Sequence, residues 1–245
     1  LPPDQQRSVL AEALAAARTI VGDDKARAEA LSAVAEKLPP DQQRPVLAEA
    51  LAAARMVGED WARADALRAV AKQLPPDPQR PVLAEALAAA RTVGVDWVRA
   101  EALRAVAKQL PPDATDLLAE ALAAARSVGE DRERAQTLSA VADKLPADAT
   151  DLQYEALQLA YSLADQLDSV AILQALAPHW PEICRARSVS EFALVCDALA
   201  TYSGATRENL LGALFALLPV IHRLGGEAAV RGTAQAIIDT AKWWP

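Results

Sequence analysis

The chain has 245 residues, of which 52% are hydrophobic and 24% charged, with a net charge of −8 and a pI near 4.9. This acidic balance argues against a nucleic-acid partner, which would need clustered Lys and Arg facing phosphates. The sequence shows no secretory signal and no apolar run of 18 residues, so we expect a cytoplasmic protein with no membrane partner.

A unit of about 36 residues fills the first 144 residues in four nearly verbatim copies. The copies run over 1–37, 38–73, 74–109 and 110–144. The second and third copies differ at only five positions, namely Gln42/Pro78, Met56/Thr92, Glu59/Val95, Ala62/Val98 and Asp65/Glu101. Such self-similarity is typical of a stacked repeat array.

The first half of each unit predicts a helix. In the second copy Pro45 suits a first helical position, and Gly58 suits a left-handed residue at the helix end. Between them the apolar side chains recur with the 3.6-residue period of one helix face: Leu47, Ala50, Leu51, Ala54 and Val57.

The second half predicts another helix that returns along the first. Asp60 is placed to cap its amino terminus. Its apolar stripe consists of Ala64, Leu67, Val70, Ala71 and Leu74. Pro75 and Pro76 then end it.

A helical hairpin of this size leaves an apolar face open on each side, and stacking covers those faces. The sequence therefore predicts an all-α fold, a right-handed α-solenoid of antiparallel helix-turn-helix repeats with tetratricopeptide-like architecture. Residues 145–181 are a degenerate fifth repeat, and residues 182–245 form a helical capping segment.

Within the capping segment the sequence predicts helices over 190–203, 206–224 and 227–242. Ser190 caps the first, and Pro219 should kink or split the second. Gly225 and Gly226 separate the second from the third. Aromatic residues are expected to close this end of the array: Trp180, Trp243 and Trp244.

The two cysteines, Cys184 and Cys196, form no CxxC pattern. We interpret them as reduced, buried thiols in a cytosolic protein, with a disulfide as the alternative.

The sequence offers no recognisable catalytic machinery. No Gly-rich phosphate loop is present, and His179 and His222 are the only histidines, so no zinc site of usual composition can be built. We expect no enzyme activity, no cofactor and no metal site. An all-α enzyme is the least favoured alternative.

Positions where near-identical repeats differ are candidates for partner binding. Lys25, Trp61, Trp97 and Arg132 share one such position, at the start of the second helix of successive units. An exposed Trp there would suit a recognition hot spot, while the alternative is a Trp packed over the turn onto the next repeat. Met56 and Thr92 share a second, weaker candidate position.

Charged residues recur in rows along the array, with Arg55, Arg63 and Arg68 accompanied by acidic neighbours. We interpret these rows as solvated ion pairs, and a ligand-binding stripe is the alternative.

The repeat LAEALAAARxVGEDWARAxALxAVAxxLPP and the tail LLPVIHRLGGEAAVRGTAQAIIDTAKWWP resemble the carboxy-terminal helical-repeat regions of bacterial STAND-class signalling ATPases, many of which have a NACHT nucleotide-binding core. The resemblance implies that these repeats form the sensor region of a larger protein. It also implies that nucleotide is bound only by a domain upstream of this segment. The unit departs from the tetratricopeptide consensus in its length and in lacking the TrpxxLeuGlyxxTyr opening.

The favoured interpretation is a non-catalytic repeat scaffold that senses a ligand or binds a protein or peptide. The alternative is a structural or self-associating scaffold without a dedicated ligand, including a designed or amplified repeat array.

Overall fold

The structure, a computed structural model, describes the backbone of residues 3–243 and the side chains of residues 5–240. Every regular element in this part of the chain is helical. The predicted role of Trp244 lies outside the described residues, as does that of the Trp243 side chain.

Two compact units make up the chain, Leu1–Leu117 and Leu118–Pro245. The first contains α1 (Pro3–Arg18), α2 (Asp24–Ala35), α3 (Pro40–Met56), α4 (Asp60–Ala71), α5 (Pro76–Thr92) and α6 (Asp96–Ala107). The boundary between the units falls within α7 (Thr115–Arg126). The second unit contains α8 (Asp131–Ala142), α9 (Thr150–Ser162), α10 (Ser169–Leu176), the 3-10 helix η1 (Ala177–His179), α11 (Trp180–Arg187), α12 (Glu191–Ser203) and α13 (Arg207–Trp243).

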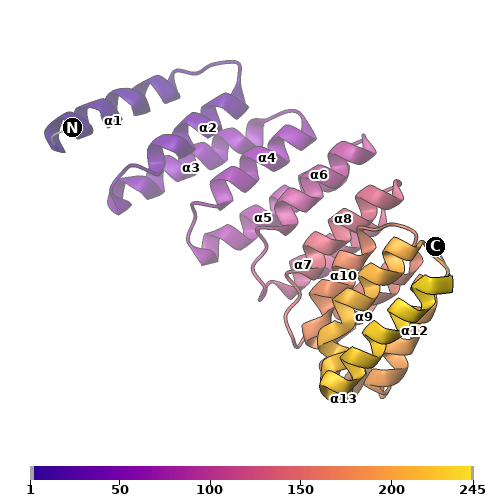
Figure 1. Cartoon of the computed structure of the whole chain (residues 1–245). Helices are drawn as coiled ribbons and strands as arrows, with labels where there is room; N and C mark the ends of the chain where they lie inside the picture. Colours follow the sequence, from indigo (N-terminus) through magenta and orange to yellow (C-terminus); the bar gives the residue numbers. More distant parts are fainter. Residues whose placement is uncertain (1–2, 244–245) are drawn as a thin grey trace. The chain divides into compact units, whose positions relative to one another are not determined.

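Helices of the first unit pack in sequential pairs, as the repeat predicts (Figure 1). The two helices of one repeat contact each other, and α2 and α4 also pack against the first helix of the following repeat. The second helices of successive repeats lie side by side, since α2 contacts α4 and α4 contacts α6. The all-α prediction is confirmed, and the packing of neighbouring helices is consistent with a helical-repeat array.

The predicted apolar stripes form the core of these pairs. Leu47, Ala50, Ala54 and Val57 of the first stripe are buried, with Leu51 partly exposed. Buried residues of the second stripe are Ala64, Leu67, Val70 and Ala71. Each fully buried leucine contributes about 1.5–3 kcal/mol, while the alanines mainly allow close approach of neighbouring helices.

The helix start predicted at Pro45 is wrong. Helix α3 begins at Pro40, with Pro39 at the N-cap, and Pro45 lies inside the helix. The N–H groups of Gln42 and Gln43 both donate to the Pro39 carbonyl at 2.9 Å. The hydrogen bonds of the first helical turn are therefore formed before Pro45. Pro40 takes the first-turn position, where a missing N–H costs least.

The predicted roles of Gly58 and Asp60 are also wrong. Helix α3 ends at Met56, the backbone of its C-cap residue Val57 is extended, and Gly58 has no positive φ. Glu59 stands at the N-cap of α4 without a side-chain cap bond, which leaves Asp60 inside the first turn. The shorter side chain at the matching position of the first repeat, Asp23, does cap α2 by accepting from the Ala26 N–H at 2.8 Å.

Buried polar contacts join the helices of the second unit. The Ser169 and Tyr202 hydroxyls are hydrogen-bonded at 2.8 Å, and Asn209 Nδ2 donates to the Ala164 carbonyl at 2.8 Å. Trp180 is fully buried, in agreement with its expected role in closing this end of the chain. The predicted cap of α12 is confirmed, because Ser190 Oγ accepts from the Ala193 N–H at 3.0 Å.

Helix α13 is interrupted at the predicted glycine pair. Gly225 has φ −144°, ψ 16° and Gly226 has φ 61°, ψ −158°, so the backbone leaves helical values there rather than at Pro219. Only glycine adopts the Gly226 conformation readily.

By length and composition alone, the stretch Arg207–Thr240 of α13 could cross a membrane, and 28% of its most apolar window is buried. This property is weak grounds for a membrane span, because a helix of a soluble protein can share it. The glycine interruption and the packing of α13 against α10 and α12 fit a folded helical unit. The absence of a membrane partner stays a prediction.

Both cysteines are unpaired, but only Cys184 is buried. Cys196 is exposed on α12, so the prediction of two buried thiols is wrong for this residue.

Candidate partner-binding groove

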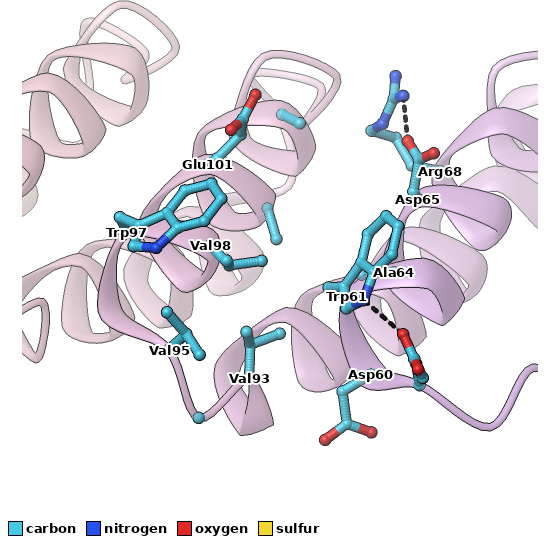
Figure 2. A pocket seen from close by; sticks show the side chains of 14 residues that line it. Asp60, Trp61, Ala64, Asp65, Arg68, Val93, Val95, Trp97, Val98 and Glu101 are labelled. Atoms are coloured by element: carbon cyan, nitrogen blue, oxygen red, sulfur yellow. Dashed lines mark hydrogen bonds and ion pairs between the residues drawn. The ribbon is translucent and has the colours of Figure 1, made fainter.

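A groove of about 800 Å³ lies between α4 and α6, the second helices of the second and third repeats (Figure 2). Small and branched apolar side chains line it: Ala64, Val93, Val95, Val98, Ala102 and Ala105. The side chains of Trp61 on α4 and Trp97 on α6, one repeat apart, also line the groove. Its charged lining residues are Glu59, Asp60, Asp65, Arg68 and Glu101.

Trp61 remains 44% exposed although its side chain contacts two polar residues, Glu59 and Lys25. Its Nε1 donates to Glu59 Oε2 at 2.7 Å, which holds the indole at the start of α4. On the side of the first repeat, Lys25 Nζ lies 4.7 Å from the centroid of the Trp61 ring. Trp61 therefore packs partly on the neighbouring repeat and still presents surface to the groove.

The Lys25 ammonium also contacts carboxylates. It lies 3.2 Å from Asp65 of the next repeat and 3.7 Å from Glu29 of its own helix. Burial alone would raise the pKa of Asp65, but hydrogen bonds from Arg68 and Lys25 outweigh it and lower that pKa. Lys25 thus sits between an indole ring and an ionised carboxylate, with its side chain only 28% exposed.

Trp97 is more exposed than Trp61 and makes fewer of the polar contacts recorded among the described residues. It is 58% exposed at the start of α6, and Val95 replaces the glutamate that holds the indole in the preceding repeat. Among the described residues, no hydrogen-bond acceptor for Trp97 Nε1 is present. Glu101, one helical turn further along α6, is exposed and has no ion-pair partner in the part of the chain that the structure describes.

The structure brings three of the six candidate residues, Lys25, Trp61 and Trp97, onto one row of second helices. Met56 is 68% exposed at the end of α3, and Thr92 at the end of α5 donates to the Ala89 carbonyl at 2.8 Å. Neither of these two lines the groove. Arg132 belongs to the second unit, where its Nε lies 3.5 Å from Asp168.

The charged rows are ion pairs, as interpreted from the sequence. Arg55 pairs with Glu85 of the next repeat at 2.7 Å, and Arg68 pairs with Asp65 at 2.5 Å. Arg18 repeats the first of these patterns with Glu49 at 2.6 Å. Such exposed pairs contribute little stability individually.

From the sequence, Asp65 and Glu101 were identified only as a position where two repeats differ, and their place beside the tryptophans was not predicted. The detectable signal was the spacing of Trp and acidic residues four apart, Trp61 with Asp65 and Trp97 with Glu101. That spacing places both side chains on one helix face.

No group of three or more His, Cys, Asp or Glu side chains that could hold a metal ion is present in the described residues. No protein-family model, curated protein or solved structure matches the chain significantly.

Proposed function

We propose that this chain is a non-catalytic repeat scaffold that binds a protein or peptide partner in the groove between α4 and α6. The observation that carries the proposal is the pair of half-exposed indoles one repeat apart on an apolar groove of about 800 Å³. Tryptophan is enriched at interaction hot spots, and concave apolar sites with a few polar groups are the usual form of binding sites.

The groove is built on packed helices, which limits the entropy lost on binding. Its lining comes from α4, α6 and the residues just before each helix. The buried stripes Ala64–Ala71 and Ala100–Ala107 anchor those helices. A segment laid into the groove would cover Trp61 and Trp97 without rearranging the core.

The resemblance of the repeat and tail to STAND-class sensor regions supports a wider role. We place the chain in the cytoplasm as the sensor part of a larger signalling ATPase, with a right-handed tetratricopeptide-like array. Nucleotide binding then belongs to an upstream domain.

The test selects short peptides from a random phage-displayed library against the whole chain and measures their affinities. Trp61→Ala and Trp97→Ala should each weaken binding by about tenfold or more, as expected for a hot spot. Circular dichroism should show unchanged helicity. Arg132→Ala, at the matching position of the fourth repeat, serves as the control and should bind normally.

An unchanged affinity in both tryptophan variants, together with lower thermal stability, would assign the indoles to packing and reject the groove as the binding site.

A self-associating scaffold is the second candidate, favoured by two large exposed aromatic side chains in the second unit. Phe192 of α12 is 67% exposed and Phe215 of α13 is 70% exposed. Sedimentation at several concentrations separates the two candidates. A dimer that dissociates on Phe215→Ser would support self-association, and a monomer at all concentrations would reject it.

A further inference from the structure

The first two repeats contain an internal example of a bound cation. Lys25 extends from α2 so that its Nζ lies 4.7 Å from the Trp61 ring centroid and 3.2 Å from the Asp65 carboxylate, both on α4. An ammonium over an indole face with a carboxylate beside it is a favourable combination of cation–π and charge-assisted contacts.

An indole ring and a carboxylate recur at the same positions one repeat later, but the lysine does not. Trp97 matches Trp61, and Glu101 matches Asp65, each 36 residues further along the chain. The position that matches Lys25 is occupied by Trp61, which carries no charge. The indole and carboxylate of α6 therefore face the groove between α4 and α6 without the ammonium that fills the preceding interface.

The charges of the groove favour a cation. Four of its lining residues are acidic, and the basic one, Arg68, is already paired with Asp65 at 2.5 Å. In the described part of the chain, no ion pair joins Glu101 to a basic side chain. A Lys or Arg of the partner would approach a carboxylate that has no basic ion-pair partner among the described residues.

We propose that Trp97 and Glu101 form a pocket for a lysine or arginine side chain of the partner peptide. The bound cation would contact Trp97 and Glu101 as Lys25 contacts Trp61 and Asp65. This inference rests on the proposed function, because it specifies the chemistry of a ligand bound in the same groove. Trp61 forms the opposite wall of the pocket (Figure 2).

In the third repeat, the indole N–H of Trp97 has no hydrogen-bond acceptor among the residues that the structure describes. Glu59 accepts the Trp61 Nε1–H at 2.7 Å, whereas Val95 stands at the equivalent position before Trp97. A backbone carbonyl of the bound peptide supplies the missing acceptor. The bound peptide would thus contribute a side-chain cation to the Trp97 ring and to Glu101. A backbone carbonyl near that cation would accept the hydrogen bond from Trp97 Nε1.

The test uses the peptides selected on the whole chain. They should be enriched in Lys or Arg at one position. Replacing that residue by norleucine should weaken binding by about tenfold, the size expected when a cation–π contact and a charge-assisted contact to a carboxylate are lost together. Glu101→Gln should produce a loss of the same order for the cationic peptide and little loss for the norleucine peptide. Glu130→Gln, an exposed carboxylate outside the groove, is the matched control and should change neither affinity.

The outcomes separate the two proposals. If Trp97→Ala abolishes binding but the Lys and norleucine peptides bind equally well, the cation pocket is rejected and the groove remains the binding site. If binding is insensitive to both Trp97→Ala and Trp61→Ala, the proposed function fails as well. If Glu101→Gln leaves a Lys-dependent affinity unchanged, the cation binds elsewhere and the pocket is rejected.

Discussion

Lys25 and Trp61 connect the first two repeats through a cation–π contact of 4.7 Å, and the same ammonium pairs with Asp65 at 3.2 Å. These two residues occupy the same repeat position in successive copies. The first supplies the cation, and the second supplies the ring that receives it.

Lys25→Met should therefore destabilise the chain. Methionine keeps much of the apolar stem but removes the charge, so the free energy of unfolding should fall by about 0.5–1 kcal/mol. Urea unfolding followed by circular dichroism measures the change. Lys37→Met is the control, since Lys37 is 65% exposed and pairs only with its neighbour Glu36 in the structure as described, and it should have no measurable effect.

Trp61→Lys should recreate the internal cation contact one repeat later, on Trp97 and Glu101. A double-mutant cycle with Glu101→Gln should give a favourable coupling of about 0.5–1 kcal/mol in unfolding free energy. The cycle cancels the separate loss of the Lys25–Trp61 contact. A coupling of zero would show that a cation at this position does not reach the α6 carboxylate.

Stability should depend on pH through Asp65. Hydrogen bonds from Arg68 and Lys25 outweigh burial and lower its pKa in the folded chain. The stabilisation is therefore fully present above the unfolded pKa of about 3.9 and is lost as the pH falls through the folded value. The difference in unfolding free energy between the native chain and Asp65→Asn should be constant from about pH 5 to 7 and shrink below about pH 4. A difference that persists unchanged into acid would contradict this assignment.

Two tyrosines of the second unit should respond oppositely to loss of the hydroxyl. Tyr202 shares a buried hydrogen bond with Ser169 at 2.8 Å, and burial, opposed by that bond, raises the pKa of Tyr202 to about 12. Tyr202→Phe should cost about 1 kcal/mol.

Burial also raises the pKa of Tyr161, but its hydroxyl has no hydrogen-bond partner in the described structure. Tyr161→Phe should therefore leave the unfolding free energy unchanged or raise it slightly. Thermal melts of the two variants side by side test the contrast, and equal losses would refute it.

The helix pairs and their buried faces could be predicted because they depend on local periodicity, as the stripe from Ala64 to Ala71 shows. Helix starts were less predictable. The Leu-Pro-Pro segment and Pro45 both offer a proline for the first turn, and sequence alone does not say which one begins the helix.

The groove was predictable only in part. Comparing repeats identified Lys25, Trp61 and Trp97 as one position, but whether they touch depends on how α2, α4 and α6 align side by side. The contact of Lys25 with Asp65 spans 40 residues, and no short-range pattern encodes it.

The most direct test of the central claim is fluorine NMR of the whole chain labelled with fluorotryptophan, titrated with a selected peptide. The five tryptophans give separate reporters that single substitutions assign. Our account predicts that the Trp61 and Trp97 signals shift together in proportion to bound peptide, while the signal of fully buried Trp180 stays in place. Saturating peptide that leaves both the Trp61 and Trp97 signals unmoved would contradict the groove between α4 and α6 as the binding site.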